Sequence, residues 1–171
     1  SGLNSTGVVV RDLRVASSAV NRFEVKSGNA QGGIHVRIAS WDPEMIQIQV
    51  FEPPGINLSE SRQKDVEKFY GRQDFRRAFY SEFGEIQFPD RAMETYVRGL
   101  LGSWDLERIR SRAYRLVIDY SHSPASLTLP YVLGDLGAEV LSLRAFNEQR
   151  HVSLGAEELD ANLEEVRRLV R

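Results

Sequence analysis

The sequence predicts an α/β fold built as two consecutive units, and three features of the chain lead to this prediction. The stretches "GGIHVRIAS" and "MIQIQVF" alternate apolar with polar residues, which is the period of a β-strand. "RLVIDY" is an almost continuous apolar run, typical of a strand that is covered on both faces. A helical stripe and the apolar "EVLSL" follow it, which is the spacing of a parallel strand–helix–strand unit.

The composition limits the classes of protein to consider. Hydrophobic residues make up 42% of the 171 residues and charged residues 27%, as in an ordinary soluble globular protein. The formal net charge is −2, so the chain offers no basic field to nucleic acid. No apolar run is long enough to span a bilayer, and no signal pattern opens the chain. We therefore expect a cytoplasmic protein that binds neither nucleic acid nor a membrane.

Metal sites built on cysteine or histidine find little support. The sequence contains no cysteine, which excludes disulfides, thiolate catalysis and cysteine-based zinc sites. Its three histidines, His35, His122 and His151, lie far apart and lack the helical spacing of metal ligands. We therefore predict no metal site in this chain.

The first unit is predicted over residues 1–88. "SGLNST" has the character of a helix end that Gly7 closes, so we expect the chain to begin within a structural unit. "GVVVRDLRV" is rich in strand formers, and "SSAVNRFEV" predicts a short helix with Val20 and Phe23 on its inner face. The two alternating stretches predict neighbouring strands or a hairpin, joined at the turn signal Asp42-Pro43. The face of these strands that is predicted to be buried consists of Ile34, Val36, Ile38, Ile46, Ile48 and Val50.

A helix is predicted after the hairpin, where "PPG" ends the second strand. Ser59 is a candidate N-cap for "ESRQKDVEKFY". Helical spacing places Val66, Phe69 and Tyr70 on the side expected to face inward.

The second unit is predicted over residues 89–171 and opens with a helix that Asp90 is placed to cap. The apolar stripe of this helix consists of Met93, Tyr96, Val97, Leu100 and Leu101. Parallel strands are predicted at Leu116–Tyr120 and Glu139–Leu143.

The helix between these strands has clear start and stop signals. It is expected to begin near Thr128, which places Pro130 in the first turn, and to be closed by Gly137. Its inner stripe consists of Leu129, Val132, Leu133 and Leu136. A last amphipathic helix is predicted from the spacing of Leu159, Leu163, Val166 and Val170.

The turn region "HVRIASWDPE" is the main candidate for chemistry. Ser40 directly follows a predicted strand, and alternation places His35 and Arg37 on one face of that strand. A serine that carries a phosphoryl group needs such cationic hydrogen-bond donors around it. We therefore take Ser40 as the candidate catalytic residue and His35 and Arg37 as candidate phosphate-binding residues. The competing interpretation of Ser40 is an ordinary turn serine.

The loop "SHSPAS", residues 121–126, is the second candidate. Its hydroxyl groups and the free amides of the following helix could bind an anion. It lacks the closely spaced glycines that let a backbone wrap around a phosphate. We therefore interpret it as a connector whose small polar side chains satisfy the amides at the helix start, with Asp119 capping the loop.

Several stretches together resemble the α-D-phosphohexomutase superfamily, the phosphomannomutases and phosphoglucomutases. "GLNSTGVVVRDLRVASSAVNRF" resembles the end of the first helix and the second strand of that family's first domain. "GGIHVRIASWDPEMIQIQVFEPPGINLSE" resembles its active-serine loop with the flanking strands. "RLVIDYSHSPASLTLPYVLGDLGAEVLSL" resembles the opening of its second domain. The resemblance implies two consecutive three-layer α/β units with mixed sheets.

The function that this resemblance implies is phosphoryl transfer within a hexose phosphate, through a phosphoserine and Mg²⁺. The chain would be the front part of such a protein, with Ser40 as the phosphoryl carrier and the missing domains of the parent protein as partners. The family's acidic metal-binding loop is not found in the sequence, so Mg²⁺ is expected only in a complete family member. We therefore expect the chain alone to be inactive.

The serine loop departs from the family's pattern. Ile38, Trp41 and Asp42 stand where the family has threonine, histidine and asparagine, and the spacing from Gly33 is one residue longer. These departures favour an alternative, in which the fold is a non-catalytic binding or assembly module of a sugar-1-phosphate nucleotidyltransferase. The resemblance is closest to the mutase-like region that is fused to such bacterial enzymes, of the mannose-1-phosphate guanylyltransferase type.

Overall fold

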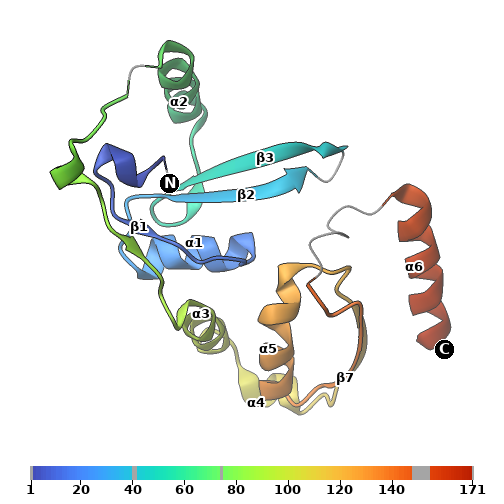
Figure 1. Cartoon of the computed structure of the whole chain (residues 1–171). Coiled ribbons are helices and arrows are strands. Elements are labelled where there is room, and N and C mark those ends of the chain that lie inside the picture. The colour runs from blue at the N-terminus through green and yellow to red at the C-terminus, as the bar shows by residue number, and fades with distance from the viewer. Residues whose placement is uncertain (1, 40–41, 74, 148–154, 171) are drawn as a thin grey trace.

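A computed structural model describes residues 2–39, 42–73, 75–147 and 155–170. It confirms the predicted α/β fold class (Figure 1). The α-helices are α1 (Ser18–Ser27), α2 (Glu60–Arg72), α3 (Ala92–Leu101), α4 (Leu106–Arg110), α5 (Leu129–Asp135) and α6 (Ala156–Leu169). The strands are β1 (Val10–Arg11), β2 (Gly33–Ala39), β3 (Asp42–Glu52), β4 (Ile56–Asn57), β5 (Ile86–Gln87), β6 (Arg115–Asp119) and β7 (Glu139–Leu143). Short 3-10 turns occur at Asn4–Thr6, Tyr80–Glu82 and Pro124–Leu127.

The described strands form small sheets of both types. β2 and β3 pair in antiparallel register, with a β-bulge between Ile38 and Ala39, and β4 extends this sheet beside β3. The hairpin that the sequence predicts is therefore present. β1 pairs in parallel with β5, which lies more than 70 positions later in the sequence. The β-rich start of the chain thus forms a strand of two residues only.

One face of the hairpin is closed by α1 (Figure 1). The buried side chains at this contact are Val20, Val25 and Phe51. A Cβ atom at Gly33 would collide with the side chains of Asn21 and Val25, so glycine at this position lets α1 approach β2 closely.

The opposite face of the hairpin contradicts the sequence-based prediction. It carries the six apolar residues, yet Val36, Ile46 and Ile48 are 59%, 69% and 63% exposed. The face that α1 covers is the one with the polar side chains, among them half-buried His35. The alternation was correct, but the assignment of the buried face was wrong, because among the described residues nothing covers the apolar side.

Helix α2 also differs from the prediction. It begins after Ser59, as predicted, but the Ser59 side chain makes no capping hydrogen bond. Val66, Phe69 and Tyr70, which were expected to face inward, are all exposed, and α2 contains no buried residue. The prediction of a helix was therefore right, but no described residue covers the side of α2 that was expected to face inward.

The second half of the chain matches its predicted elements more closely. β6 and β7 are parallel and in register from Arg115 with Glu139 to Asp119 with Leu143. α5 begins after Thr128 with Pro130 in its first turn, and Gly137 adopts the predicted left-handed conformation with φ +69°. Asp90 does not cap α3, since Arg91 occupies the N-cap position and makes no side-chain cap.

The main buried cluster of the described residues belongs to this half. Val97 and Leu101 of α3 pack against Val132 of α5, and further half-buried apolar side chains surround them. Figure 1 shows β6 and β7 between α5 and α6. Val117 and Ile118, expected to be buried, are only half-buried, because within the described residues this sheet has two strands and no further strand pairs with either edge. The unit boundary near residue 88 stays a prediction.

Within the described ranges, no helix has both the length and the apolar character needed to cross a membrane.

Candidate functional site

The structure places His35 and Arg37 on one face of β2, as the alternation predicts. His35 lies opposite Gln49 and Arg37 opposite Gln47 on the neighbouring strand. The Arg37 Nε donates a hydrogen bond to Gln47 Oε1 at 2.7 Å. No acidic side chain of the described residues forms an ion pair with Arg37. An exposed guanidinium with a neutral partner keeps donors available for a carboxylate or a phosphate.

His35 has a different electrostatic character. Partial burial, followed by the nearby charge of Arg37, lowers the pKa of His35 below its ordinary value of 6.5. The imidazole is therefore neutral at pH 7. It can donate one hydrogen bond and accept another, but it does not add a positive charge beside Arg37.

Ser40 lies outside the described residues, together with Trp41. The backbone is described up to Ala39, which is buried, and again from Asp42. The Asp42 Oδ1 accepts a hydrogen bond from the Glu44 backbone N–H at 2.9 Å, which is an Asx-type turn at the start of β3. The structure thus describes the strand ends that bracket Ser40.

The loop at residues 121–126 is tied into the fold through Asp119. Its carboxylate accepts a hydrogen bond from the Ser121 backbone N–H at 2.9 Å, as expected for a residue that caps the loop. It also accepts two hydrogen bonds from Arg144, at 2.9 and 2.8 Å. These bonds hold the pKa of Asp119 below its ordinary value. Arg144 in turn reaches Glu165 of α6 at 2.7 Å.

The polar side chains of this loop do not act as predicted. The Ser126 hydroxyl donates to the Ser123 carbonyl at 2.9 Å and does not accept from the helix amides. Thr128, at the N-cap position of α5, makes no side-chain cap either. His122 is fixed by its ring Nδ1, 2.9 Å from the Phe146 carbonyl oxygen. The loop therefore has the internal bonding of a connector, through hydroxyl-to-carbonyl bonds instead of caps.

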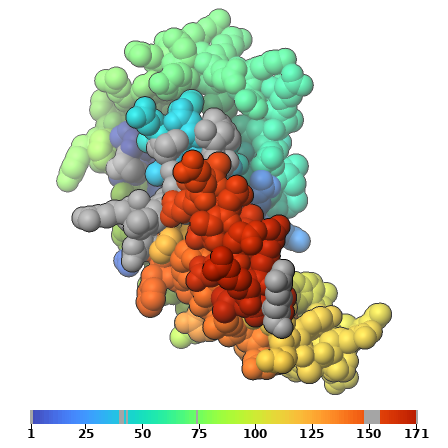
Figure 2. Space-filling model, turned by 90° about the vertical axis from the view of Figure 1, so that its right-hand side faces the viewer, coloured from blue at the N-terminus to red at the C-terminus, as the bar shows by residue number. Residues whose placement is uncertain are grey.

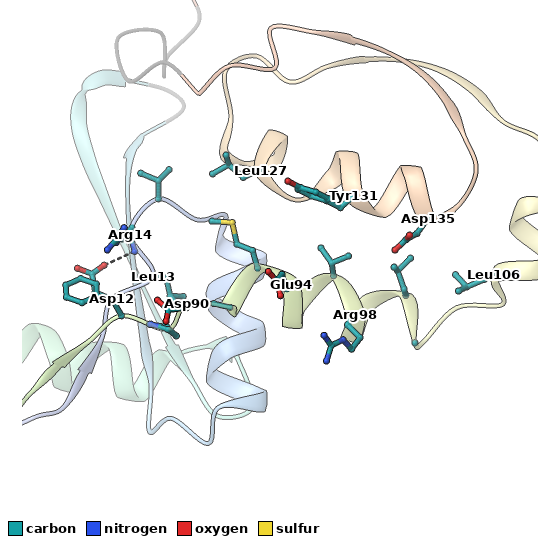
Figure 3. Close-up of a pocket in the computed structure, with 18 residues that line it drawn as sticks. Asp12, Leu13, Arg14, Asp90, Glu94, Arg98, Leu106, Leu127, Tyr131 and Asp135 are labelled. Carbon is teal, nitrogen blue, oxygen red and sulfur yellow. Dashed lines mark hydrogen bonds between the residues drawn. The ribbon is translucent and has the colours of Figure 1, made fainter.

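An open cavity of about 1000 Å³ lies between α3 and α5 (Figure 3). The turn of Asp12 and Arg14 forms one end of it and Leu106 the other, while Tyr131 projects from α5. The Arg14 backbone N–H donates to Asp12 Oδ1 at 2.7 Å, and the Arg14 guanidinium stacks on the ring of Phe88. Apolar residues of α3 and α5 form most of the remaining wall.

The charges around this cavity do not favour an anion. Two arginines line it against four carboxylates, and the charged lining residues are Asp12, Arg14, Asp90, Glu94, Arg98 and Asp135. Sequence reasoning missed this cavity, because its lining comes from three segments far apart in the chain. No local motif carries a signal for such a site.

No metal site is evident in the described part of the chain. None of its residues form a group of three or more His, Asp or Glu side chains that could hold an ion. The described residues therefore do not fit the Mg²⁺ that the family resemblance implies.

Comparison with known proteins gave a consistent set of relatives, although no family model matches the sequence. The chain is 32% identical over all of its 171 residues to a phosphoglucomutase/phosphomannomutase of Thermococcus kodakarensis, of which it spans 37%. It is 30% identical over 144 residues, 83% of the chain, to a phosphoglucosamine/phosphogalactosamine mutase of Sulfurisphaera tokodaii, of which the match covers 31%.

A solved structure shares the fold. The crystal structure of a phosphoglucomutase/phosphomannomutase family protein from Burkholderia thailandensis superposes with a TM-score of 0.76 at 20% identity. The superposition covers 96% of this chain and 36% of that protein. The chain thus spans only about a third of the length of the proteins it resembles.

Proposed function

Because the chain belongs to the phosphohexomutase superfamily, we propose that it is the front part of a protein that transfers a phosphoryl group on a hexose phosphate. The observation that carries this proposal is the match over all 171 residues to a protein named phosphoglucomutase/phosphomannomutase. The chain spans 37% of that relative, so the activity is proposed for the longer protein. Residues 1–88 and 89–171 would be its first two domains.

The proposed chemistry uses the end of β2. The Ser40 hydroxyl oxygen would carry a phosphoryl group and transfer it to a free hydroxyl of the hexose monophosphate, which becomes a bisphosphate. The phosphoryl group that the sugar carried at the start would then be transferred to the Ser40 oxygen, which leaves the isomeric monophosphate and restores the phosphoserine. Arg37, three residues before Ser40, would hold phosphate oxygens, for which the planar guanidinium fork is well suited. Neutral His35 would contribute a hydrogen bond without charge. Phosphoryl transfer depends mainly on such positioning and charge neutralisation.

An assay of the 171-residue chain tests this proposal. With glucose 1-phosphate or mannose 1-phosphate and Mg²⁺, we expect no turnover above background, because the described residues contain no group of side chains that could hold a metal ion. Turnover that disappears in Ser40→Ala would show that the chain is itself catalytic. Binding of the same sugar phosphates, measured by calorimetry, should be weakened in Arg37→Ala and unchanged in Arg108→Ala, a matched loss of charge on α4.

A specific observation favours a second candidate function. Ile38 replaces the threonine of the family's serine loop and pairs with Ile46 across the hairpin, so a hydroxyl group is replaced by an aliphatic side chain. In this alternative, the fold is a non-catalytic binding or assembly module of a sugar-1-phosphate nucleotidyltransferase. This alternative predicts that Arg37→Ala does not weaken the binding of hexose phosphates. The calorimetric comparison of Arg37→Ala with Arg108→Ala therefore separates the two functions.

A further inference from the structure

Gln47 is the side chain that holds Arg37 near the turn end of the hairpin. The two residues are directly opposed in the paired strands β2 and β3, so their side chains rise from the same face of the sheet, with Cβ atoms roughly 5 Å apart. The Gln47 Oε1 accepts the hydrogen bond from Arg37 Nε at 2.7 Å. Gln47 is half-buried whereas Arg37 is exposed, so the amide is the anchored member of the pair.

This hydrogen bond decides which edge of the guanidinium is left for a ligand. A guanidinium carries N–H donors on Nε and on both Nη atoms. It can therefore clamp an anion with two parallel bonds, either from Nε and one Nη or from both Nη atoms. Because Gln47 occupies the Nε–H of Arg37, the edge formed by the two Nη groups is the one that stays available.

The neutrality of Gln47 matters as much as its position. An amide oxygen accepts the hydrogen bond without cancelling the positive charge of Arg37, whereas a carboxylate in the same place would form an ion pair. In the part of the chain that the structure describes, none of the ion pairs includes Arg37. The cyan residues of the hairpin show at the surface of the molecule above helix α6 (Figure 2). The guanidinium is thus oriented before a ligand arrives, which lowers the entropy that binding costs.

We propose that Gln47 is a positioning residue, which holds the Arg37 guanidinium so that both Nη groups are presented to the phosphate of a hexose phosphate. This inference rests on the proposed phosphate-binding role of Arg37. Gln47 acts only through Arg37, by fixing its orientation and by leaving its charge intact. An ordinary cross-strand pair would instead stabilise the hairpin without any effect on the affinity for a ligand.

Calorimetry of the whole chain with glucose 1-phosphate tests this role. Gln47→Met keeps the length of the side chain but removes the acceptor, so the dissociation constant should rise about three- to tenfold, as expected when one long side chain is no longer ordered beforehand. Gln47→Glu keeps the acceptor but neutralises Arg37, so the dissociation constant should rise further than in Gln47→Met. Gln63→Glu on α2 adds the same charge away from the hairpin and should bind like the parent chain.

The Arg37 side chain offers a second measurement, which a change in hairpin stability alone does not move. In the parent chain the Nε–H is already bonded to Gln47, so in NMR spectra glucose 1-phosphate should leave its chemical shift nearly unchanged while the Nη resonances shift. In Gln47→Met the Nε–H is free to bind, and its resonance should then shift with the ligand.

The outcomes separate the role of Gln47 from the proposed function. If Arg37→Ala weakens binding but either Gln47 variant binds as tightly as the parent chain, the positioning role is overturned and the role of Arg37 stands. A large ligand-induced shift of the Arg37 Nε–H in the parent chain also overturns the positioning role. If the parent chain does not bind glucose 1-phosphate, or if Arg37→Ala binds it equally well, the proposed role of Arg37 fails and the inference fails with it.

Discussion

The β2–β3 hairpin and the β6–β7 pair are both two-stranded ladders that lead into a polar loop, but they are completed in different ways. β6 and β7 lie between α5 and α6, and the loop that follows β6 is hydrogen-bonded to Asp119, to the Arg144 carbonyl and to the Phe146 carbonyl. The hairpin is covered on one face only, and the Arg37 guanidinium beside its turn has one neutral side-chain partner. A loop whose polar groups are already bonded serves the fold, whereas an exposed guanidinium that has only a neutral partner keeps donors for a ligand.

The largest effect expected from this difference concerns the closed core. Leu133 is 8% exposed on α5 beside the buried Val132, so Leu133→Ala removes buried methyl groups and leaves a cavity. We expect a loss of roughly 2–5 kcal/mol in the free energy of unfolding, measured by urea titration. A loss below about 1 kcal/mol would show that Leu133 is not packed in a buried core.

The next effect concerns the connection between Asp119 and Arg144. Asp119→Asn removes the negative charge and one of the two carboxylate oxygens that accept hydrogen bonds from Arg144, and it should cost about 1–3 kcal/mol at pH 7. The pKa of Asp119 is lowered by folding, so its stabilisation is present above the unfolded value of about 3.9 and is lost as the pH falls through the folded value. The difference between parent and variant should therefore be constant from about pH 5 to 7 and shrink below about pH 4.

A matched change separates this pair from an ordinary surface ion pair. Glu165 also bonds Arg144, but it is 51% exposed. Glu165→Gln should therefore cost no more than about 1 kcal/mol, and the loss should diminish in high salt. An equal loss of unfolding free energy in Asp119→Asn and Glu165→Gln would contradict this account, because Asp119 would then stabilise the fold no more than an exposed ion-pair partner does.

The smallest effect is expected on the exposed apolar side of the β2–β3 hairpin. Ile48 is 63% exposed, so Ile48→Ala removes little buried surface and should cost less than about 1 kcal/mol, mostly through lower β-propensity. A loss as large as that of Leu133→Ala would mean that the face is covered in solution by part of the same chain.

The sequence was a good guide wherever a local constraint decides the structure. Pro130 and Gly137 mark the first turn and the end of α5, and the two alternating stretches predict the strands of the hairpin, because these signals depend on backbone geometry and residue period. The resemblance to the phosphohexomutases is likewise confirmed by the relatives and by the shared fold.

The sequence was a poor guide wherever a distant element decides. Alternation separates the two faces of β2 and β3 but does not say which face a helix will cover, so the buried face of Ile34, Val36 and Ile48 was assigned wrongly. The bond between Asp119 and Arg144 joins residues 25 positions apart, and the cavity joins three separate segments. None of these contacts has a local signature.

The comparison between the two loops is tested most directly by an NMR titration of the chain with glucose 6-phosphate or mannose 6-phosphate. The account predicts that the largest amide shifts occur at Arg37 and its neighbours at the end of β2, while His122 and Ser123 stay unchanged. Largest shifts at His122 and Ser123, with Arg37 silent, would contradict it and place the ligand site at the carboxyl end of β6.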